Sequence, residues 1–164
     1  MKLLISDANI LIDMEEGGLI EAMFKLPETF AVPNVLFMEE LVEHHPELPG
    51  HGLQVLELGE LAVADTYRLR QQYRRPSLND LFAMALAKQE ACPLLTGDMN
   101  LRETAVQENV ELRGTLWLIE RMVAEDIITV EQAAEAYERM RAASRRLPWT
   151  EVAKQLKQFG NKIR

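Results

Sequence analysis

The chain has a single cysteine, Cys92, among its 164 residues, so it contains no internal disulfide. We therefore expect a protein of the reducing cytoplasm, with Cys92 packed as a small apolar side chain. No apolar run reaches 18 residues, and Asp7 and Asn9 interrupt the N-terminal apolar stretch. We expect neither a membrane-spanning helix nor a secretory leader. With three histidines and one cysteine, the sequence is also poor in zinc ligands.

Basic residues are scarce in the first part of the chain. Residues 1–67 contain 2 basic and 13 acidic side chains, residues 68–164 contain 16 basic and 13 acidic ones, and the net charge is −8. This division fits an acidic cation-binding region beside a more basic surface. It fits equally well an acidic protein with unevenly charged helices, so charge alone does not select a function.

Short apolar strands alternate with helices along residues 1–128. Strands are predicted at residues 2–6, 29–32, 53–58, 93–96 and 110–113. Helices are predicted at residues 8–14, 21–25, 34–45, 60–73, 77–91, 100–109 and 115–127, and a loop at residues 46–52. This order predicts an α/β domain with a central parallel sheet of about five strands, covered by helices on both faces.

The C-terminal residues show helical patterns only. Thr129 and Gln132 have the spacing of a capping box, which predicts a helix to about residue 144. A second helix is predicted from about residue 147. We therefore divide the chain into a domain at residues 1–128 and a helical extension at residues 129–164, which packs on that domain or on a second copy of the chain.

Four acidic positions stand at strand ends or in neighbouring helices. Asp7 follows the first apolar run, and Asp98 follows the run PLLTG. Asp80 lies in the first turn of the predicted helix SLNDLFAMALA. Glu40, or its neighbour Glu39, lies in the helix after the second strand. Because ligands of open α/β sheets bind at the carboxyl ends of the strands, these acids can converge at one edge of the sheet.

Four carboxylates in one place repel one another, and some stay protonated unless a counter-charge is present. A hard divalent cation resolves this conflict, and Mg²⁺ or Mn²⁺ suits carboxylate and water ligands. One such ion, or two about 4 Å apart, can activate a water molecule and clamp a phosphodiester. The set of acids therefore predicts hydrolysis of a phosphate ester.

Each acid also has an ordinary structural explanation. Asp80 follows a serine at capping-box spacing, and Asp7 and Asp98 can each cap the helix that follows. Glu39 and Glu40 can simply be solvated. Taken singly, each residue favours the structural explanation. The set of four favours a site, because two of its members end apolar runs.

The segments SDANILID, VPNVLFMEEL, SLNDLFAMALA and LLTGDMNLR resemble the PIN domain, over residues 1–128. That family comprises metal-dependent ribonucleases and includes the toxins of VapBC-type toxin–antitoxin pairs. The resemblance implies a three-layer α/β/α fold and a nuclease domain that hydrolyses RNA with Mg²⁺ or Mn²⁺. It also implies a small antitoxin protein as a partner, and a homodimer.

The resemblance also implies roles for individual residues. The acids that hold the metal and carry the catalysis are Asp7, Glu40, Asp80 and Asp98. Glu40 is preferred over Glu39 because a leucine follows it, as is usual in the family, but both remain candidates. Asn9 and Thr96 are implied to orient these ligands. The expected reaction is in-line attack on phosphorus by a metal-activated water, without a covalent intermediate.

Substrate binding needs cations in addition to the metal. The segment RLRQQYRR precedes the Asp80 helix, which makes its Arg74 and Arg75 candidates, and Arg102 is a third. An ordinary solvated helix face explains RLRQQYRR equally well. Both tryptophans are more readily explained as core or interface residues than as platforms for base stacking.

Two other functions remain open. Phosphatases of the haloacid-dehalogenase type also begin with a strand-end aspartate, but they need a second acid where Asn9 stands. These phosphatases and the response regulators also need a late lysine, and none lies near Asp98. The other alternative is a catalytically inactive PIN-like binding module, in which the acids are structural. Asp98→Asn would then leave any phenotype unchanged.

Overall fold

Five short strands form one sheet at the centre of the molecule. The computed structural model describes residues 2–163, with side chains up to residue 161. The strands are β1 (Leu3–Ser6), β2 (Thr29–Pro33), β3 (Gln54–Leu56), β4 (Leu94–Leu95) and β5 (Leu112–Arg113). Their order is β3-β2-β1-β4-β5, and every adjacent pair is parallel. The predicted α/β fold with a parallel sheet of about five strands is confirmed.

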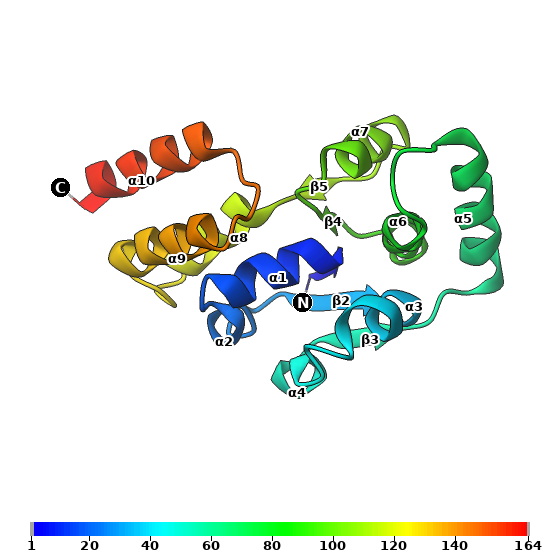
Figure 1. Cartoon of the computed structure of the whole chain (residues 1–164), viewed down its shortest axis with the longest axis horizontal. Coiled ribbons are helices and arrows are strands. Elements are labelled where there is room, and N and C mark those ends of the chain that lie inside the picture. Colours follow the sequence, from blue (N-terminus) through cyan, green and yellow to red (C-terminus); the bar gives the residue numbers. More distant parts are fainter. Residues whose placement is uncertain (1, 164) are drawn as a thin grey trace.

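Helices surround the sheet in an α/β/α arrangement (Figure 1). In chain order they are α1 (Ala8–Glu16), α2 (Ile20–Met23), α3 (Asn34–Leu36), the π-helix η1 (Phe37–Leu41), α4 (Leu48–His51), α5 (Glu60–Gln72), α6 (Leu78–Glu90), α7 (Met99–Gln107), α8 (Thr115–Ala124), α9 (Val130–Ala142) and α10 (Trp149–Ile163). No helix within residues 2–163 has both the length and the apolar character needed to cross a bilayer.

Helix α6 is the most deeply buried helix next to the sheet. Every side chain from Leu81 to Ala87 is buried, and the helix packs on β1, β2 and β4. A helix that is apolar on all sides belongs inside the core, where its position is strongly constrained. The first turn of α6, with Asp80, is therefore held in place beside the strand ends.

The segment between β2 and β3 differs from its prediction. The continuous helix predicted at residues 34–45 is wrong, because α3 passes into η1, where the Val42 N–H donates to the Phe37 carbonyl at 2.8 Å. A π-helix places extra residues in a turn, which apolar spacing does not reveal. The loop predicted at residues 46–52 contains α4. Pro49 is compatible with a first helical turn, and Gly52, at φ 126°, ends the helix.

The C-terminal helices lie together at the end of the molecule opposite α5 (Figure 1). Helix α9 packs on α1 and α8, and α10 packs on α9. The predicted capping box is confirmed, since Thr129 and Gln132 exchange hydrogen bonds at 2.7 and 3.0 Å. Buried Tyr137 of α9 donates to Gln155 of α10 at 2.5 Å. The division of the chain at residue 128 stays a prediction.

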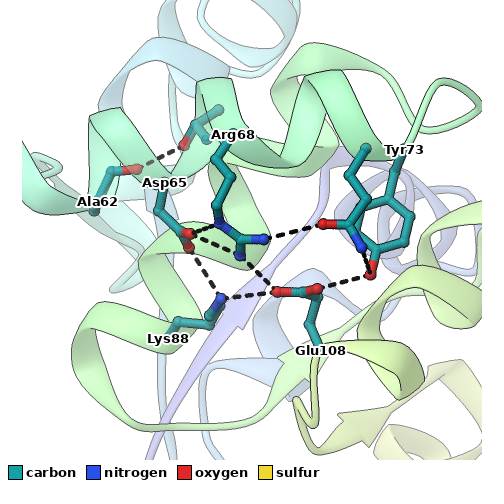
Figure 2. Close-up of polar contacts among 8 residues, drawn as sticks. Ala62, Asp65, Arg68, Tyr73, Lys88 and Glu108 are labelled. Atoms are coloured by element: carbon teal, nitrogen blue, oxygen red, sulfur yellow. Dashed lines mark hydrogen bonds and ion pairs between the residues drawn. The ribbon is translucent and has the colours of Figure 1, made fainter.

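A network of charges joins α5, α6 and the end of α7 (Figure 2). Glu108 accepts hydrogen bonds from Arg68 and the Tyr73 hydroxyl at 2.7 Å, and from Lys88 at 3.1 Å. Asp65 pairs with Arg68 at 2.9 Å and with Lys88 at 3.0 Å. Burial raises the pKa of Glu108, but the hydrogen bonds it accepts outweigh this effect and lower the pKa to about 2. Arg68 and Tyr73 of the segment RLRQQYRR thus stabilise the packing of α5 against its neighbours.

Glu108→Gln is expected to lower the free energy of unfolding by about 2 kcal/mol at pH 7, because the amide removes the charge that faces Arg68 and Lys88. The pKa of Glu108 is depressed below its usual 4.5, so the stabilisation is complete above that pH and is lost as the pH falls toward about 2. Urea denaturation at several pH values between neutral and acidic measures this stabilisation. The control Glu103→Gln, at an exposed position of α7, should change stability by less than about 0.5 kcal/mol. Equal losses in both variants would contradict the role of the network.

Candidate functional site

Asp7 and Asp98 follow the carboxyl ends of adjacent strands. Ser6 of β1 pairs with Leu95 of β4, and each acid lies shortly after that pair. The order of the sheet also reverses here, since β2 and β3 lie on one side of β1 and β4 and β5 on the other. Such a reversal opens a crevice at the strand ends, where ligands of open α/β sheets bind.

Asp7 is completely buried, and both of its carboxylate oxygens accept hydrogen bonds. The Ile10 N–H donates to Oδ1 at 3.0 Å, and the Thr96 hydroxyl donates to Oδ2 at 2.5 Å. Thr96 Oγ1 in turn accepts from the Asp98 N–H at 3.0 Å. Thr96 therefore links the side chain of one strand-end acid to the backbone of the other.

Three of the four acids also cap helices. Asp7 caps α1, and Asp98 caps α7 by accepting from the Leu101 N–H at 2.9 Å. Asp80 forms the predicted capping box with Ser77. The structural explanation is thus confirmed for each of them. A carboxylate has about four lone-pair sites, so a capping bond leaves capacity for a second ligand.

Asp80 is close enough to the other three acids for the charges to affect ionisation. Burial raises the pKa of Asp7 to about 7, against the hydrogen bonds it accepts, and the charges of Asp80 and Asp13 add to the rise. Burial and then the charge of Asp80 raise the pKa of Glu40. Burial raises the pKa of Asp80, and the charge of Asp98 adds to it. We call Asp7, Glu40, Asp80 and Asp98 the acidic group.

The two glutamates of η1 share Asn79 as a partner. Asn79 Nδ2 donates to Glu39 Oε2 at 2.8 Å. Burial and the charge of Asp80 raise the pKa of Glu40, and a hydrogen bond with Asn79 opposes that rise. Asn79 Oδ1 is buried and has no hydrogen-bond partner among residues 2–161. Sequence reasoning did not single out Asn79, although its place beside Asp80 was visible. The preference for Glu40 over Glu39 stays a prediction.

The oxygen atoms of this region fit a hydrated divalent cation. Within residues 2–161, no three carboxylates of the acidic group offer oxygens within 4.8 Å of one another, so the group is too open to enclose a bare ion. Mg²⁺ keeps several waters and binds through one or two carboxylates, which suits this spacing. A cation would relieve the repulsion within the group, and it or its water would satisfy Asn79 Oδ1. The all-oxygen donor set suits Mg²⁺ or Mn²⁺.

A partly buried ion pair connects this region to the C-terminal helices. Arg145 donates to Asp13 Oδ1 at 2.6 Å, and the Thr115 hydroxyl donates to Asp13 Oδ2 at 3.1 Å. Arg145 also donates to the backbone and side-chain oxygens of Asn9, at 3.4 and 3.3 Å. The expected role of Asn9 toward the acids stays a prediction. Sequence reasoning missed Asp13 and Arg145, because 132 residues separate them and no motif marks either.

Arg102 and the arginines of the segment RLRQQYRR take different positions in the structure. Arg70 is half-buried, and its charge opposes the rise in the pKa of Asp80, so it lies near the acidic group. Arg74 and Arg75 are exposed in the turn that leads into α6. Arg102 is exposed on α7 and lines a cavity. Their contact with substrate stays a prediction.

Two other features could suggest a metal site or a catalytic nucleophile, but both have an ordinary structural explanation. Glu15, His45 and Glu47 offer ligand atoms within 4.8 Å of one another, at the end of α1 away from Asp7. His45 Nδ1 contacts a carboxylate oxygen of Glu15 there, and both glutamates are exposed. Cys92 is half-buried, and burial raises the pKa of its thiol to about 11. Its thiolate is therefore scarce at neutral pH.

One family model matches the sequence of this chain, and a solved structure shares its fold. A family model described as DUF3368: PIN domain matches residues 3–161, a range that reaches into α10. A crystal structure of VapBC2 from Rickettsia felis bound to a DNA fragment from their promoter is similar, with a TM-score of 0.50 and 13% sequence identity. The similarity covers 70% of this chain and 98% of that one, and at such low identity it shows the fold alone. No curated protein matches the sequence.

Proposed function

This chain belongs to the PIN domain family, whose members are generally nucleases, and from that premise we propose that it is a ribonuclease that hydrolyses RNA phosphodiester bonds with Mg²⁺ or Mn²⁺. The observation that carries the proposal is the position of Asp80, whose interactions with Asp7, Glu40 and Asp98 join four acids into one repelling group. Helix capping does not require several carboxylates in one place. Binding a cation that carries a phosphate does require them.

Each residue of the acidic group has a role in this proposal. A bound Mg²⁺ or Mn²⁺ would supply Lewis-acid activation of water and neutralise charge on the phosphate during in-line displacement. Asp7 and Asp98, which Thr96 links, are the principal ligands. Asp80 and Glu40 complete the set or orient the attacking water. Burial raises the pKa of Asp7 to about 7, and Asp7 would hold the cation as the deprotonated carboxylate.

We further infer a VapBC-type arrangement for the protein in the cytoplasm. In it, a small antitoxin covers the acidic group and places a basic side chain among the carboxylates, and the chain forms a homodimer. The fold shared with VapBC2 and the acidic crevice at the strand ends support this inference. Light scattering of the purified protein tests the dimer, and co-purification with the product of a neighbouring reading frame tests the antitoxin.

The deciding experiment is a thermal melt of the purified protein in Mn²⁺ up to millimolar concentrations, with Asp98→Asn in parallel. A ligand that binds only the folded state raises the melting temperature with concentration. We expect this rise in the wild type and its loss in Asp98→Asn. Asp126→Asn, which makes the same chemical change at an exposed position, should keep the rise.

Cleavage of RNA by the same three proteins completes the test. Wild type and Asp126→Asn should cleave RNA in Mn²⁺ and be inactive in EDTA, and Asp98→Asn should be inactive in both. If no variant responds to Mn²⁺ and none cleaves RNA, the protein is a binding module and the ribonuclease proposal is wrong. Undiminished cleavage by Asp98→Asn would remove that residue from the site.

A further inference from the structure

A cavity of about 630 Å³ lies beside the acidic group, between the edge of the sheet and the C-terminal helices. Its walls come from Gly97, from residues 112–117 of β5 and α8, and from residues 146–148 between α9 and α10. Figure 1 shows that the connection between α9 and α10 passes next to α8. We name this cavity the Arg102–Arg146 pocket, after two arginines in its walls.

The pocket adjoins the acidic group through two of its wall residues. Gly97 directly precedes Asp98, and Asp13 lies near enough to Asp7 for its charge to affect that carboxyl group. An RNA strand with one phosphate at the acidic group can therefore place an adjacent nucleotide in the pocket.

The uncompensated charge of the pocket is positive. Arg102 and Arg146 are both exposed, and among residues 2–161 neither guanidinium has a hydrogen bond or an ion pair. The remaining charged wall residues are paired: Arg113 with Glu111, Asp13 with Arg145, and Glu151 with Lys154. Two free cations at one cavity, in a chain with a net charge of −8, favour an anionic ligand.

The rest of the pocket is apolar and partly aromatic. Trp117 is half-buried in its wall, and the Arg113 guanidinium lies 5.8 Å from the centre of the Trp117 ring. The other apolar wall residues are Leu112, Leu116, Leu147 and Pro148. Nucleic acid bases stack on aromatic and guanidinium planes, and phosphates bind to guanidinium groups. The volume lies within the range of roughly 300–1,000 Å³ that is typical of small-ligand sites.

We propose that the Arg102–Arg146 pocket binds the nucleotide of single-stranded RNA next to the scissile phosphate. Arg102 and Arg146 hold its phosphate, and the base packs on Trp117 and the apolar wall. Single-stranded RNA is specified because the base must leave its stack to reach a tryptophan. This inference rests on the proposed function, and it makes the C-terminal extension part of the substrate site.

The first test measures binding in the absence of metal. A fluorescein-labelled RNA of about ten nucleotides is titrated in EDTA, and anisotropy gives the Kd. Arg102→Ala/Arg146→Ala should weaken binding about tenfold or more, and should flatten the slope of log Kd against log salt by about 0.7, which is the contribution of the one phosphate that the two arginines hold. The control Lys25→Ala/Lys157→Ala, at two exposed positions outside the pocket walls, should change Kd less than about twofold.

Tryptophan fluorescence gives a second readout that depends on the base. In a Trp149→Phe background, Trp117 is the only tryptophan, and RNA should quench its emission. Absence of RNA binding by the wild type, equal affinity of wild type and the arginine double variant, or absence of quenching would each overturn the proposal. Retained RNA affinity together with release of a co-expressed protein partner would assign the pocket to protein docking instead.

The two proposals fail in different measurements. The arginine double variant should keep the Mn²⁺-induced rise in melting temperature, because it leaves the acidic group intact. Asp98→Asn should lose that rise and still bind RNA in EDTA. If Mn²⁺ does not raise the melting temperature of the wild type, the result counts against the ribonuclease proposal. If the arginine double variant binds RNA with an unchanged Kd, the result counts against the pocket proposal.

Discussion

Asp7→Asn is expected to reduce the rate of RNA cleavage about a thousandfold and, at the same time, to raise the melting temperature of the metal-free protein at pH 8 by about 5 °C. The loss of activity follows from the loss of a charged ligand for the cation. The gain in stability follows because the wild type buries a carboxylate completely, next to the charges of Asp80 and Asp13. The amide fills the same space without that charge.

The gain in stability depends on pH in a definite direction. Burial raises the pKa of Asp7 from 3.8 to about 7, so between these values the native protein holds a proton that the unfolded chain has released. The stability of the wild type therefore falls as the pH rises through this window. The variant has no such titration. The two melting curves should coincide near pH 4, separate up to about pH 7 and stay apart above it.

Calorimetry from pH 4 to pH 9 in EDTA, followed by cleavage assays in Mn²⁺, measures both effects. Asp126→Asn should match the wild type in activity and in the shape of its pH profile. A variant that melts below the wild type at pH 8 would show that the carboxylate of Asp7 stabilises the fold. A variant that cleaves RNA at the wild-type rate would remove Asp7 from the catalytic site.

Arg145→Ala should lower the free energy of unfolding by about 3 kcal/mol, because it leaves the carboxylate of Asp13 buried without its partner. The side chain of Asp13 is 8% exposed, and among residues 2–161 only the Thr115 hydroxyl would still donate to it. Burial raises the pKa of Asp13, and Arg145 opposes that rise. Without Arg145, the pKa should therefore rise further. Urea denaturation at pH 7 gives the loss in stability.

A neighbouring arginine provides the matched control. Arg146→Ala removes an exposed side chain and should change stability by less than about 0.5 kcal/mol. Asp13→Asn, added to Arg145→Ala, should restore part of the loss, because the buried charge is then removed as well. Equal stability of Arg145→Ala and Arg146→Ala would mean that the ion pair makes no net contribution.

Local patterns in the sequence predicted most of the elements, whereas their order in space is visible only in the structure. The apolar runs before Asp7 and Gly97 marked β1 and β4, because buried parallel strands are continuously apolar. Nothing in the spacing shows that these two strands are neighbours. Thr96 and Asp7 are 89 residues apart, and their contact depends on how the helices between them pack.

The same limit applies to the candidate site. Asp7, Asp80 and Asp98 stood out because each follows an apolar run or begins a helix, and both patterns are local. The π-helix that carries Glu40 was not predictable, because its i→i+5 hydrogen bonds leave no distinct spacing in a short segment. Arg145 was missed because it acts on Asp13 through a tertiary contact made by the C-terminal extension.

The strand order also bears on how the protein is synthesised. The central strand β1 leaves the ribosome first, but its neighbour β4 begins only at Leu94. A nascent chain that ends before that residue contains Asp7 but neither Thr96 nor Asp98, and cannot assemble the acidic group. Under the proposed function, a ribonuclease made on a machine built largely of RNA is thus inert until Thr96 and Asp98 have been synthesised.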